Sequence, residues 1–442
     1  MTIHVDLTDV AAHTLACRSL TGIQRVQLEY ARALARRDDC RASIFSNLHG
    51  ANVDLKHLFS DPRSTGAEAI FMQMRRLLGL APDFGPSRRA LEVARASGAA
   101  KLRAARAVLR GAVGAPRRRR FEPSDCLYVG GAFWAHPQSV RTYEQAVRDG
   151  TDVVVLFHDV LPIAVPDLAD GNCRPLYERM LRLRARALTV SRHSQAEIER
   201  ARRALGAPAD LPPARVVPLA HEFSAAPRNF VAVGPPSGRI AAIERGRSFA
   251  LCVGTVEARK NQLPLIRLWE RLAREMGPAW PRLIVAGNGG WRARETVHAL
   301  RRADAAAPYA WIEAPTDEEL AWLYSRAAFT VFPSLAEGWG LPIGESLWFG
   351  KPCVASNAAS MPEVGGSLCA YADPRAIESF AGPILRLVHD ADFHRASVAA
   401  IQASPLRTWR ETADALLDAT LPVRSRGADA PSGKVLASSP AF

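Results

Sequence analysis

The 442-residue chain is predicted to be an α/β protein built from two doubly wound parallel sheets. Segments with strand composition alternate with segments of helical periodicity through both halves of the chain. Residues 224–247 are rich in Pro, Gly and Arg, as an interdomain linker would be. Residues 151–157 form a nearly continuous apolar run, which is typical of a strand buried on both faces of a parallel sheet.

Composition indicates an ordinary globular protein. Hydrophobic residues make up 48% of the chain and charged residues 23%, and no apolar run is long enough to cross a membrane. The first residues lack the pattern of a secretory signal. Seven scattered cysteines without a C-x-x-C pair favour buried free thiols. We therefore expect a cytoplasmic location.

The net charge of +13 is concentrated in one segment. Residues 86–120 hold ten Arg and one Lys against a single Glu, so this segment carries +10 and the rest of the chain +3. A helix with an apolar line and arginines on its other sides is predicted at 102–113. The segment is either a solvated arm or a contact with an anionic membrane surface. The nearly neutral remainder and the lack of a nucleic-acid motif argue against a nucleic-acid partner.

The first half is expected to begin with a strand at residues 2–6 and a loop leading to Gly22 at the start of a helix. A glycine between a strand and a helix N-terminus suits a phosphate or sugar contact, although an ordinary junction fits equally well. Arg25 lies in the same helical turn, with an interdomain salt bridge as the alternative to a ligand contact. Further strands are predicted at residues 42–46, 126–129, 187–191 and 216–219.

His158 directly follows the apolar run at 151–157. The carboxyl end of a parallel strand is where open α/β sheets bind ligands, so His158 is a candidate ligand contact. A lone histidine in this position is more often a structural, hydrogen-bonded residue, and that remains its alternative role.

The second half is expected to open with a strand at 249–253, followed by Gly254 and Thr255. Arg259 and Lys260 come next. Such a pair is usually solvated, but at the end of a parallel strand it is suited to neutralising a phosphate.

A further strand at 283–286 leads to a turn that contains Gly287 and Asn288. The turn lacks the G-x-G-x-x-G spacing, so no dinucleotide redox cofactor is expected. A base or ribose contact from this turn is open.

Residues 331–356 predict a strand end, a glycine-rich turn, a helix at 343–349 and a second strand. Gly338 and Gly340 flank Trp339, so the backbone can approach a ligand closely. Leu341 and Pro342 then lead into the helix, whose unpaired N–H groups favour an anion.

Two carboxylates, Glu337 and Glu345, stand on either side of this turn with seven residues between them. Glu345 could accept hydrogen bonds from a ribose diol, and Glu337 could contact a sugar. The alternatives are a solvated loop residue for Glu337 and a helix N-terminal acid for Glu345. The flanking residues favour the binding roles, because several independent constraints coincide.

With these flanking residues, the stretch resembles the donor-site signature of retaining glycosyltransferases of family four, which have the GT-B fold. Its Glu-Gly-Trp-Gly-Leu-Pro variant, followed by Ser-Met-Pro-Glu-Val at 360–364, is similar to bacterial mannosyltransferases of surface polysaccharide synthesis. The resemblance is strong from about residue 249 to 374 and rests on short patches upstream. It implies two Rossmann-like, doubly wound domains facing across a cleft.

The expected organisation has five parts. An acceptor-side domain at 1–223, with an insertion at about 55–120, is followed by the linker at 224–247. A nucleotide-sugar-binding domain at 248–408, a helix at 409–422 that crosses back to the first domain, and a disordered tail at 423–442 complete the chain.

The resemblance implies four catalytic residues: Glu337, His158, Lys260 and Arg259. The implied donor contacts are Gly22, Gly254, Thr255, Gly287, Asn288, Gly338, Trp339, Gly340, Leu341 and Glu345. The family usually has an arginine where this chain has Thr255, and we expect Arg259 to supply that charge. No metal site is expected, and Asp390-Ala391-Asp392 is interpreted as a turn.

The resemblance thus implies a retaining, metal-independent hexosyltransferase with a nucleotide-sugar co-substrate and no cofactor. GDP-mannose is the first expectation for the donor and a UDP-hexose the second. The acceptor is expected to be a glycan or lipid-linked glycan. The rival hypotheses are a non-enzymatic basic binding protein and a sugar phosphorylase, although no pyridoxal phosphate motif is visible.

Overall fold

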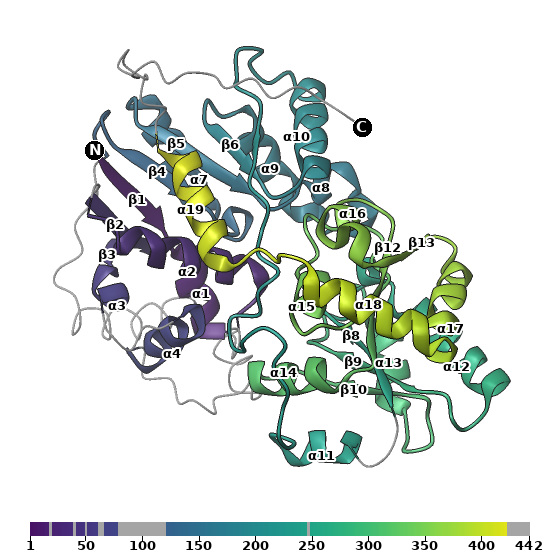
Figure 1. Cartoon of the computed structure of the whole chain (residues 1–442). Coiled ribbons are helices and arrows are strands. Elements are labelled where there is room, and N and C mark those ends of the chain that lie inside the picture. The colour runs from purple at the N-terminus through teal and green to yellow at the C-terminus, as the bar shows by residue number, and fades with distance from the viewer. Residues whose placement is uncertain are drawn as a thin grey trace, which may run out of the picture.

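The computed structural model describes residues 1–16, 20–38, 41–48, 51–60, 66–77, 121–244 and 248–421. It shows two α/β domains (Figure 1). The strand order is β3-β2-β1-β4-β5-β6-β7 in the first sheet and β10-β9-β8-β11-β12-β13 in the second. All neighbouring strands are parallel except β2 and β3, which form an antiparallel pair at the edge of the first sheet. The prediction of two doubly wound sheets is confirmed.

The first sheet contains β1 (Thr2–Asp6), β2 (Arg41–Leu48), β3 (Ala51–Asp54), β4 (Cys126–Val129), β5 (Asp152–Phe157), β6 (Arg186–Thr189) and β7 (Arg215–Val216). The accompanying helices are α1 (Thr8–Ala16), α2 (Gly22–Ala35), α3 (Lys56–Ser60), α4 (Ala67–Leu77), α7 (Pro137–Arg148), α8 (Leu161–Ala164), α9 (Arg174–Arg182) and α10 (Arg192–Ala204).

The second sheet contains β8 (Phe249–Val253), β9 (Arg282–Ala286), β10 (Tyr309–Ile312), β11 (Phe329–Phe332), β12 (Cys353–Ser356) and β13 (Ala370–Ala372). The accompanying helices are α11 (Gly238–Glu244), α12 (Gln262–Met276), α13 (Arg294–Arg302), α14 (Asp317–Arg326), α15 (Leu341–Trp348), α16 (Met361–Gly365), α17 (Ala381–His389) and α18 (Ala391–Ala403). The last helix, α19 (Trp409–Thr420), lies on the first domain.

Strand β5 shows why its sequence is apolar at consecutive positions. Val154 and Leu156 pack into the apolar cluster on one face of the first sheet, and Val153 and Val155 pack into the cluster on the other face. Because helices cover both faces, neither set of alternate side chains meets water. The run therefore ends at the carboxyl edge of the sheet, where His158 begins the next segment.

Two parts of the first domain differ from the sequence expectation. The predicted loop before Gly22 contains helix α1, which starts where the Asp6 carboxylate accepts a hydrogen bond from the backbone N–H of Thr8 at 2.8 Å. Helices α3 and α4 fall within the segment interpreted as an insertion, yet they bury Leu58, Ile70 and Phe71 in the core of the domain. Tertiary burial forms these helices despite weak local signals.

The expected linker also contains structure. Helix α11 lies inside residues 224–247 and buries Ile240 and Ile243 in the second domain. Arg239 on this helix forms an ion pair with the buried Glu319 of α14. The Pro- and Gly-rich composition of this segment did not predict α11, a helix of seven residues that is stabilised by its packing.

Helix α19 returns to the first domain after α18 in the second (Figure 1). Trp409 and Leu416 join the same apolar cluster as β1 and α2. The Arg186 Nη1 atom donates a hydrogen bond to the carbonyl oxygen of Ala419 at 2.9 Å. A capping box of Thr408 and Glu411 starts the helix. The chain therefore passes between the two domains twice.

Some predictions lie outside the described residues. They are the basic segment at 86–120, its helix at 102–113 and the tail at 423–442. In the part of the chain that the structure describes, no helix has the length and apolar character needed to cross a membrane.

Candidate active site

A cavity of about 470 Å³ lies between the two domains. Loops at the carboxyl ends of strands from both sheets line it, as expected for doubly wound folds. All the predicted catalytic and donor-binding residues border this cavity: Gly22, His158, Gly254, Thr255, Arg259, Lys260, Gly287, Asn288, Glu337, Gly338, Trp339, Gly340, Leu341 and Glu345. Their placement supports a shared site, whereas their individual roles remain predictions.

The Glu337 carboxylate connects two cations at one end of the cavity. Its Oε2 atom lies 2.6 Å from Arg259 Nη1, and its Oε1 atom lies 2.6 Å from Lys260 Nζ. The Ser334 hydroxyl also donates to Oε1 at 2.8 Å. Arg259 forms a second ion pair with Glu257 at 2.6 Å and donates to the carbonyl oxygen of Ala336. This network fixes both cations in position.

Electrostatics keep Glu337 ionised. Burial alone would raise the pKa of its carboxyl, but Arg259 and Lys260 outweigh burial and lower that pKa to about 2. Burial likewise opposes the charge of Arg259, whereas Glu337 and Glu257 favour it and raise its pKa. The cluster therefore combines Arg259 and Lys260 with the Glu337 and Glu257 carboxylates that pair with them.

The turn before α15 brings the second domain against the first. A Cβ atom on Gly338 would lie 1.9 Å from the backbone oxygen of His158, so a side chain at this position would collide with the first domain. Gly340 has a φ of 109° and directly precedes the first helical residue, Leu341. Trp339 packs in an apolar cluster that contains residues of both domains, and it also borders the cavity. The turn therefore serves both interdomain packing and the cavity wall.

His158 is held at the end of β5. Its Nε2 atom lies 2.8 Å from the carbonyl oxygen of Gly130, and burial lowers the pKa of the ring. A neutral imidazole that donates from Nε2 to this carbonyl leaves Nδ1 as an acceptor. His158 is therefore a structurally fixed histidine that borders the cavity, and its contact with a ligand stays a prediction.

Glu345 lies on the first turns of α15, and its Oε2 atom accepts a hydrogen bond from the Tyr324 hydroxyl at 2.8 Å. Burial raises the pKa of its carboxyl, while the nearby Arg25 opposes this shift. A carboxylate in this position can accept hydrogen bonds from neighbouring hydroxyl groups of a ligand.

The glycine turns of the second domain fit closely together. A Cβ atom on Gly287 would lie 2.1 Å from the carbonyl oxygen of Gly254, and Gly287 has a φ of 153°. Thr255 and Asn288 stay exposed beside these turns. Only glycine permits this approach of the β8 and β9 loops, and so the cavity wall here is backbone.

Several cavity residues were missed or left unassigned by sequence reasoning. Asp159 and Glu257 add carboxylates near Arg259, and Asp317 forms an ion pair with Arg25 at 3.1 Å. The Arg25 contact is the interdomain salt bridge considered as an alternative. Asp159 and Glu257 lie next to predicted motifs in the sequence, and this proximity could have identified them as site residues. By contrast, nothing local in the sequence pairs Arg25 with Asp317.

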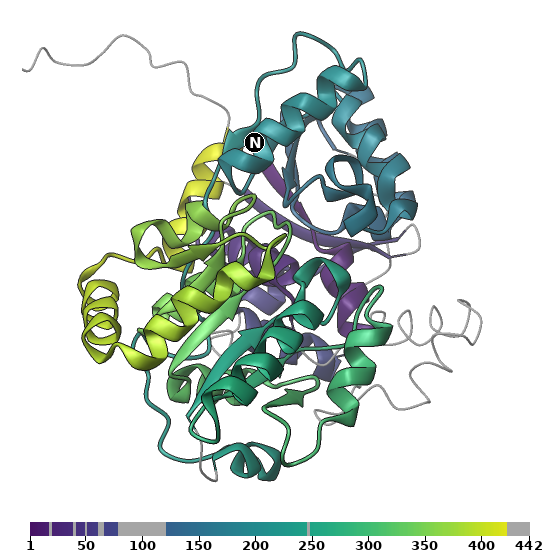
Figure 2. The same cartoon turned by 90° about the vertical axis from the view of Figure 1, so that its right-hand side faces the viewer.

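Further contacts between the two domains lie away from these residues. The Glu363 carboxylate of α16 accepts hydrogen bonds at 2.8 Å from the backbone N–H groups of Arg192 and His193, at the N-terminus of α10. Arg292 Nη1 donates to the carbonyl oxygen of Asp167 at 3.0 Å. These contacts join the two domains, whose ribbons lie against each other in Figure 2.

In the described segments, no cluster of three or more His, Cys, Asp or Glu side chains could hold a metal ion. Asp390 instead caps α18 by accepting from the backbone N–H of Phe393 at 2.8 Å. The interpretation of Asp390-Ala391-Asp392 as a turn is therefore corrected, because Ala391 and Asp392 lie in the first turn of α18.

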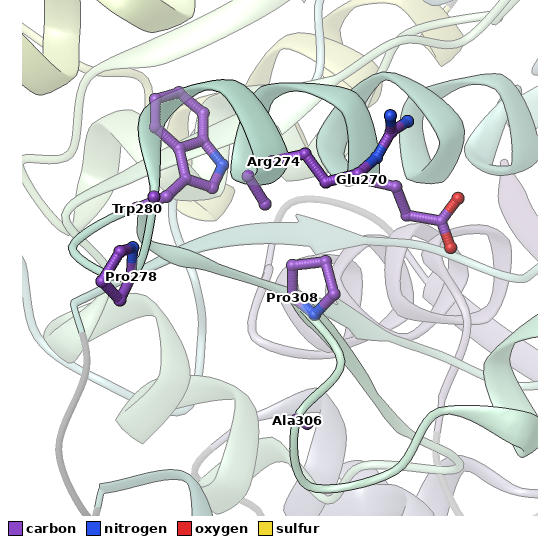
Figure 3. Close-up of a pocket in the computed structure, with 8 residues that line it drawn as sticks. Glu270, Arg274, Pro278, Trp280, Ala306 and Pro308 are labelled. Atoms are coloured by element: carbon purple, nitrogen blue, oxygen red, sulfur yellow. The ribbon is translucent and has the colours of Figure 1, made fainter.

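A second cavity, of about 460 Å³, lies on the second domain between α12 and the loop before β10 (Figure 3). Pro278, Trp280 and Pro308 form much of its wall, with Glu270 and Arg274 nearby. None of the predicted site residues borders it. The interdomain cavity is therefore the candidate active site.

Comparison with known proteins finds sequence similarity chiefly in the second domain. Residues 239–402 match the family described as Glycosyl transferases group 1. The chain is 33% identical over 153 residues to O-antigen chain mannosyltransferase B of Escherichia coli, covering 35% of this chain and 40% of the relative. It is 27% identical over 300 residues to the serotype-specific mannosyltransferase WbdA of Escherichia coli, covering 65% of this chain and 36% of the relative. The matches therefore span well under half the length of these relatives.

Two solved structures share the two-domain fold. HepE of Anabaena, in complex with UDP and glucose, has a TM-score of 0.57 at 14% sequence identity, with 95% of this chain and 99% of that chain covered. Sucrose-phosphate synthase of Thermosynechococcus elongatus has a TM-score of 0.56 at 15% identity, with 95% and 98% covered. The GT-B arrangement is thereby confirmed.

Proposed function

We propose that this chain, whose second domain is a group 1 glycosyltransferase domain, transfers a hexose from a nucleotide sugar to a glycan or lipid-linked glycan. The observation that carries the proposal is the interdomain cavity. It combines the Arg259–Lys260–Glu337 cluster, the N-terminus of α15 and the Glu345 carboxylate in one space. This set of groups complements a diphosphate, a sugar and a ribose.

The donor is proposed to lie along the cavity with its diphosphate near Arg259 and Lys260. Breaking the sugar–phosphate bond leaves negative charge on the diphosphate. Both side chains and the N-terminal N–H groups of α15 would stabilise that charge, because they are fixed before reaction. Glu337 bridges the two cations and holds them in position. No metal ion is required in this scheme.

The hexose is proposed to lie between His158 and Glu337, which both border the cavity near the place where Gly338 meets the first domain. The anomeric configuration would be retained if the acceptor hydroxyl attacks the sugar on the face from which the leaving group departs. The departing phosphate oxygen would then take the proton of the hydroxyl. The protein contributes position and charge, and no enzymic nucleophile is needed.

Mannose from GDP-mannose is the first donor proposed, with UDP-hexoses as the second. Support comes from the mannosyltransferase names of the two relatives described above, and from the Glu-Gly-Trp-Gly-Leu-Pro variant at residues 337–342. The basic segment at 86–120 suggests that the acceptor is reached at an anionic membrane surface, where lipid-linked glycans are carried.

The direct test is turnover of a nucleotide-sugar panel by the purified protein. Release of GDP from GDP-mannose, enhanced by a glycan or lipid-linked acceptor, is the expected result. Release only from UDP-hexoses would correct the donor. No release from any donor, with no nucleoside diphosphate binding, would overturn the proposed function and favour the binding-protein alternative.

A further inference from the structure

The first turn of α2 is where the first domain contacts the donor half of the cavity. A Cβ atom on Gly22 would lie 2.6 Å from Leu341 Cδ1, at the start of α15. One helical turn later, Arg25 reaches α14. Both contacts border the cavity, so a single turn of the first domain touches the starts of two helices of the second.

Arg25 joins three parts of the chain. Its Nη2 atom lies 3.1 Å from Oδ2 of Asp317, in the first turn of α14. Its Nη1 atom donates to the Ser224 hydroxyl at 2.5 Å, and its guanidinium lies 5.7 Å from the ring centroid of Phe223. Phe223 and Ser224 belong to the segment that crosses between the domains. The Arg25 side chain is only 7% exposed, so its charge is little screened by water.

The charges around Glu345 explain why the position of Arg25 matters. The carboxyl accepts a hydrogen bond from the Tyr324 hydroxyl, and the charges of Arg25 and Lys260 favour its ionised form, whereas the charge of Asp317 opposes it. Burial disfavours ionisation as well. Of the two cations, Arg25 alone belongs to the first domain. Its counter-charge therefore reaches Glu345 and Asp317 only when the domains are together.

We propose that Arg25 is a positioning residue through which closure of the cleft and binding of the nucleotide half of the donor strengthen each other. This inference rests on the proposed function, in which the ribose hydroxyls bind the ionised Glu345. A bound ribose favours the ionised carboxylate, which attracts Arg25 and holds the domains closed. By the same linkage, closure brings the cation that keeps Glu345 ionised for the ribose.

The experiment compares Arg25→Gln, Arg25→Lys and Arg32→Gln with the wild type. Arg32 lies on the same helix and pairs with Glu29 within the first domain, so its variant controls for effects on α2. The radius of gyration is measured by small-angle X-ray scattering with and without GDP or UDP. Nucleotide affinity is measured by calorimetry from pH 5.5 to 8, and kcat and KM are measured with the active nucleotide sugar.

For the wild type and Arg32→Gln, we expect a smaller radius of gyration when the nucleotide binds. The Arg25→Gln protein should keep its larger radius of gyration when the nucleotide is added, and its kcat should be at least tenfold lower than that of the wild type. As the pH decreases, its nucleotide affinity should begin to fall at a higher pH than that of the wild type. Arg25→Lys should recover part of each property, because it restores the charge without the planar fork. A merely structural contact would not move the pH profile.

The results separate this inference from the proposed function. An Arg25→Gln protein that contracts, binds and turns over like the wild type would overturn the role of Arg25 and leave the transferase function intact. Turnover by a wild type that shows no contraction would do the same. A wild-type protein without nucleotide binding or turnover would instead overturn both.

Discussion

Glu345→Gln tests the proposed ribose contact with little change in side-chain volume. The Glu345 carboxylate already accepts a hydrogen bond from the Tyr324 hydroxyl, and an amide oxygen can keep that bond. The amide nitrogen, however, offers donors where a ribose diol needs acceptors. Hydrogen bonds to a charged acceptor contribute roughly 1.5–3 kcal/mol, so nucleoside diphosphate affinity should fall by about one to two decades.

Isothermal titration of GDP and UDP into both proteins measures this loss. Tyr324→Phe is the matched control, because it removes the hydroxyl that contacts Glu345 but leaves the carboxylate. We expect this control to retain most of the wild-type affinity. Unchanged affinity in Glu345→Gln, with an affinity loss in the tyrosine variant, would refute the ribose assignment and indicate that α14 and α15 merely need their mutual contact.

Four further predictions concern charge, pH, metal and membrane. Lys260→Ala and Arg259→Ala should each lower kcat by roughly a hundredfold or more, the scale of one lost electrostatic donor; an inactive Lys260 variant beside a fully active Arg259 variant would show that Arg259 does not replace the arginine missing at Thr255. Nucleotide affinity, measured by titration, should weaken as the pH falls toward the pKa of Glu345, which burial raises, because the ribose needs the deprotonated form, whereas Glu345→Gln should lack this dependence. EDTA should leave turnover unchanged and NMR should show a product with the anomeric configuration of the donor; metal-dependent turnover or inversion would exclude the proposed class. Replacing Arg103, Arg106, Arg110 and Arg117 to Arg120 by Gln should abolish sedimentation with anionic liposomes without affecting nucleotide affinity, since each basic side chain near such a surface contributes about 1 kcal/mol; equal liposome binding by both proteins at low salt would exclude the membrane role.

Sequence reasoning located the candidate site because the chemistry lies at strand ends. The apolar run at 151–157 predicts a buried parallel strand, and parallel strands in one sheet bring their carboxyl ends to one edge. His158 and Arg259 are therefore expected at facing edges of two sheets, and the structure places both at the cavity. Local patterns were sufficient there, since the positions depend on strand direction alone.

The parts that could not be predicted depend on contacts between distant segments. Arg25 and Asp317 are 292 positions apart, and each sits in an ordinary first helical turn. Helix α11 lacks a strong local signal and owes its place to the burial of Ile240 and Ile243. In such cases the local structure depends on the distant segment that it packs against, and a local window of sequence does not contain that segment.

Helix α19 has a consequence for the order in which the protein is made. During synthesis the N-terminal parts of a chain can fold first. Here the first domain needs Trp409 and Leu416 to cover its apolar cluster, and these residues leave the ribosome after the whole second domain. The earliest domain to be synthesised is therefore the last to be completed. Until then an apolar face beside α2 stays open, which makes the nascent chain a candidate client for chaperones that bind exposed apolar surface.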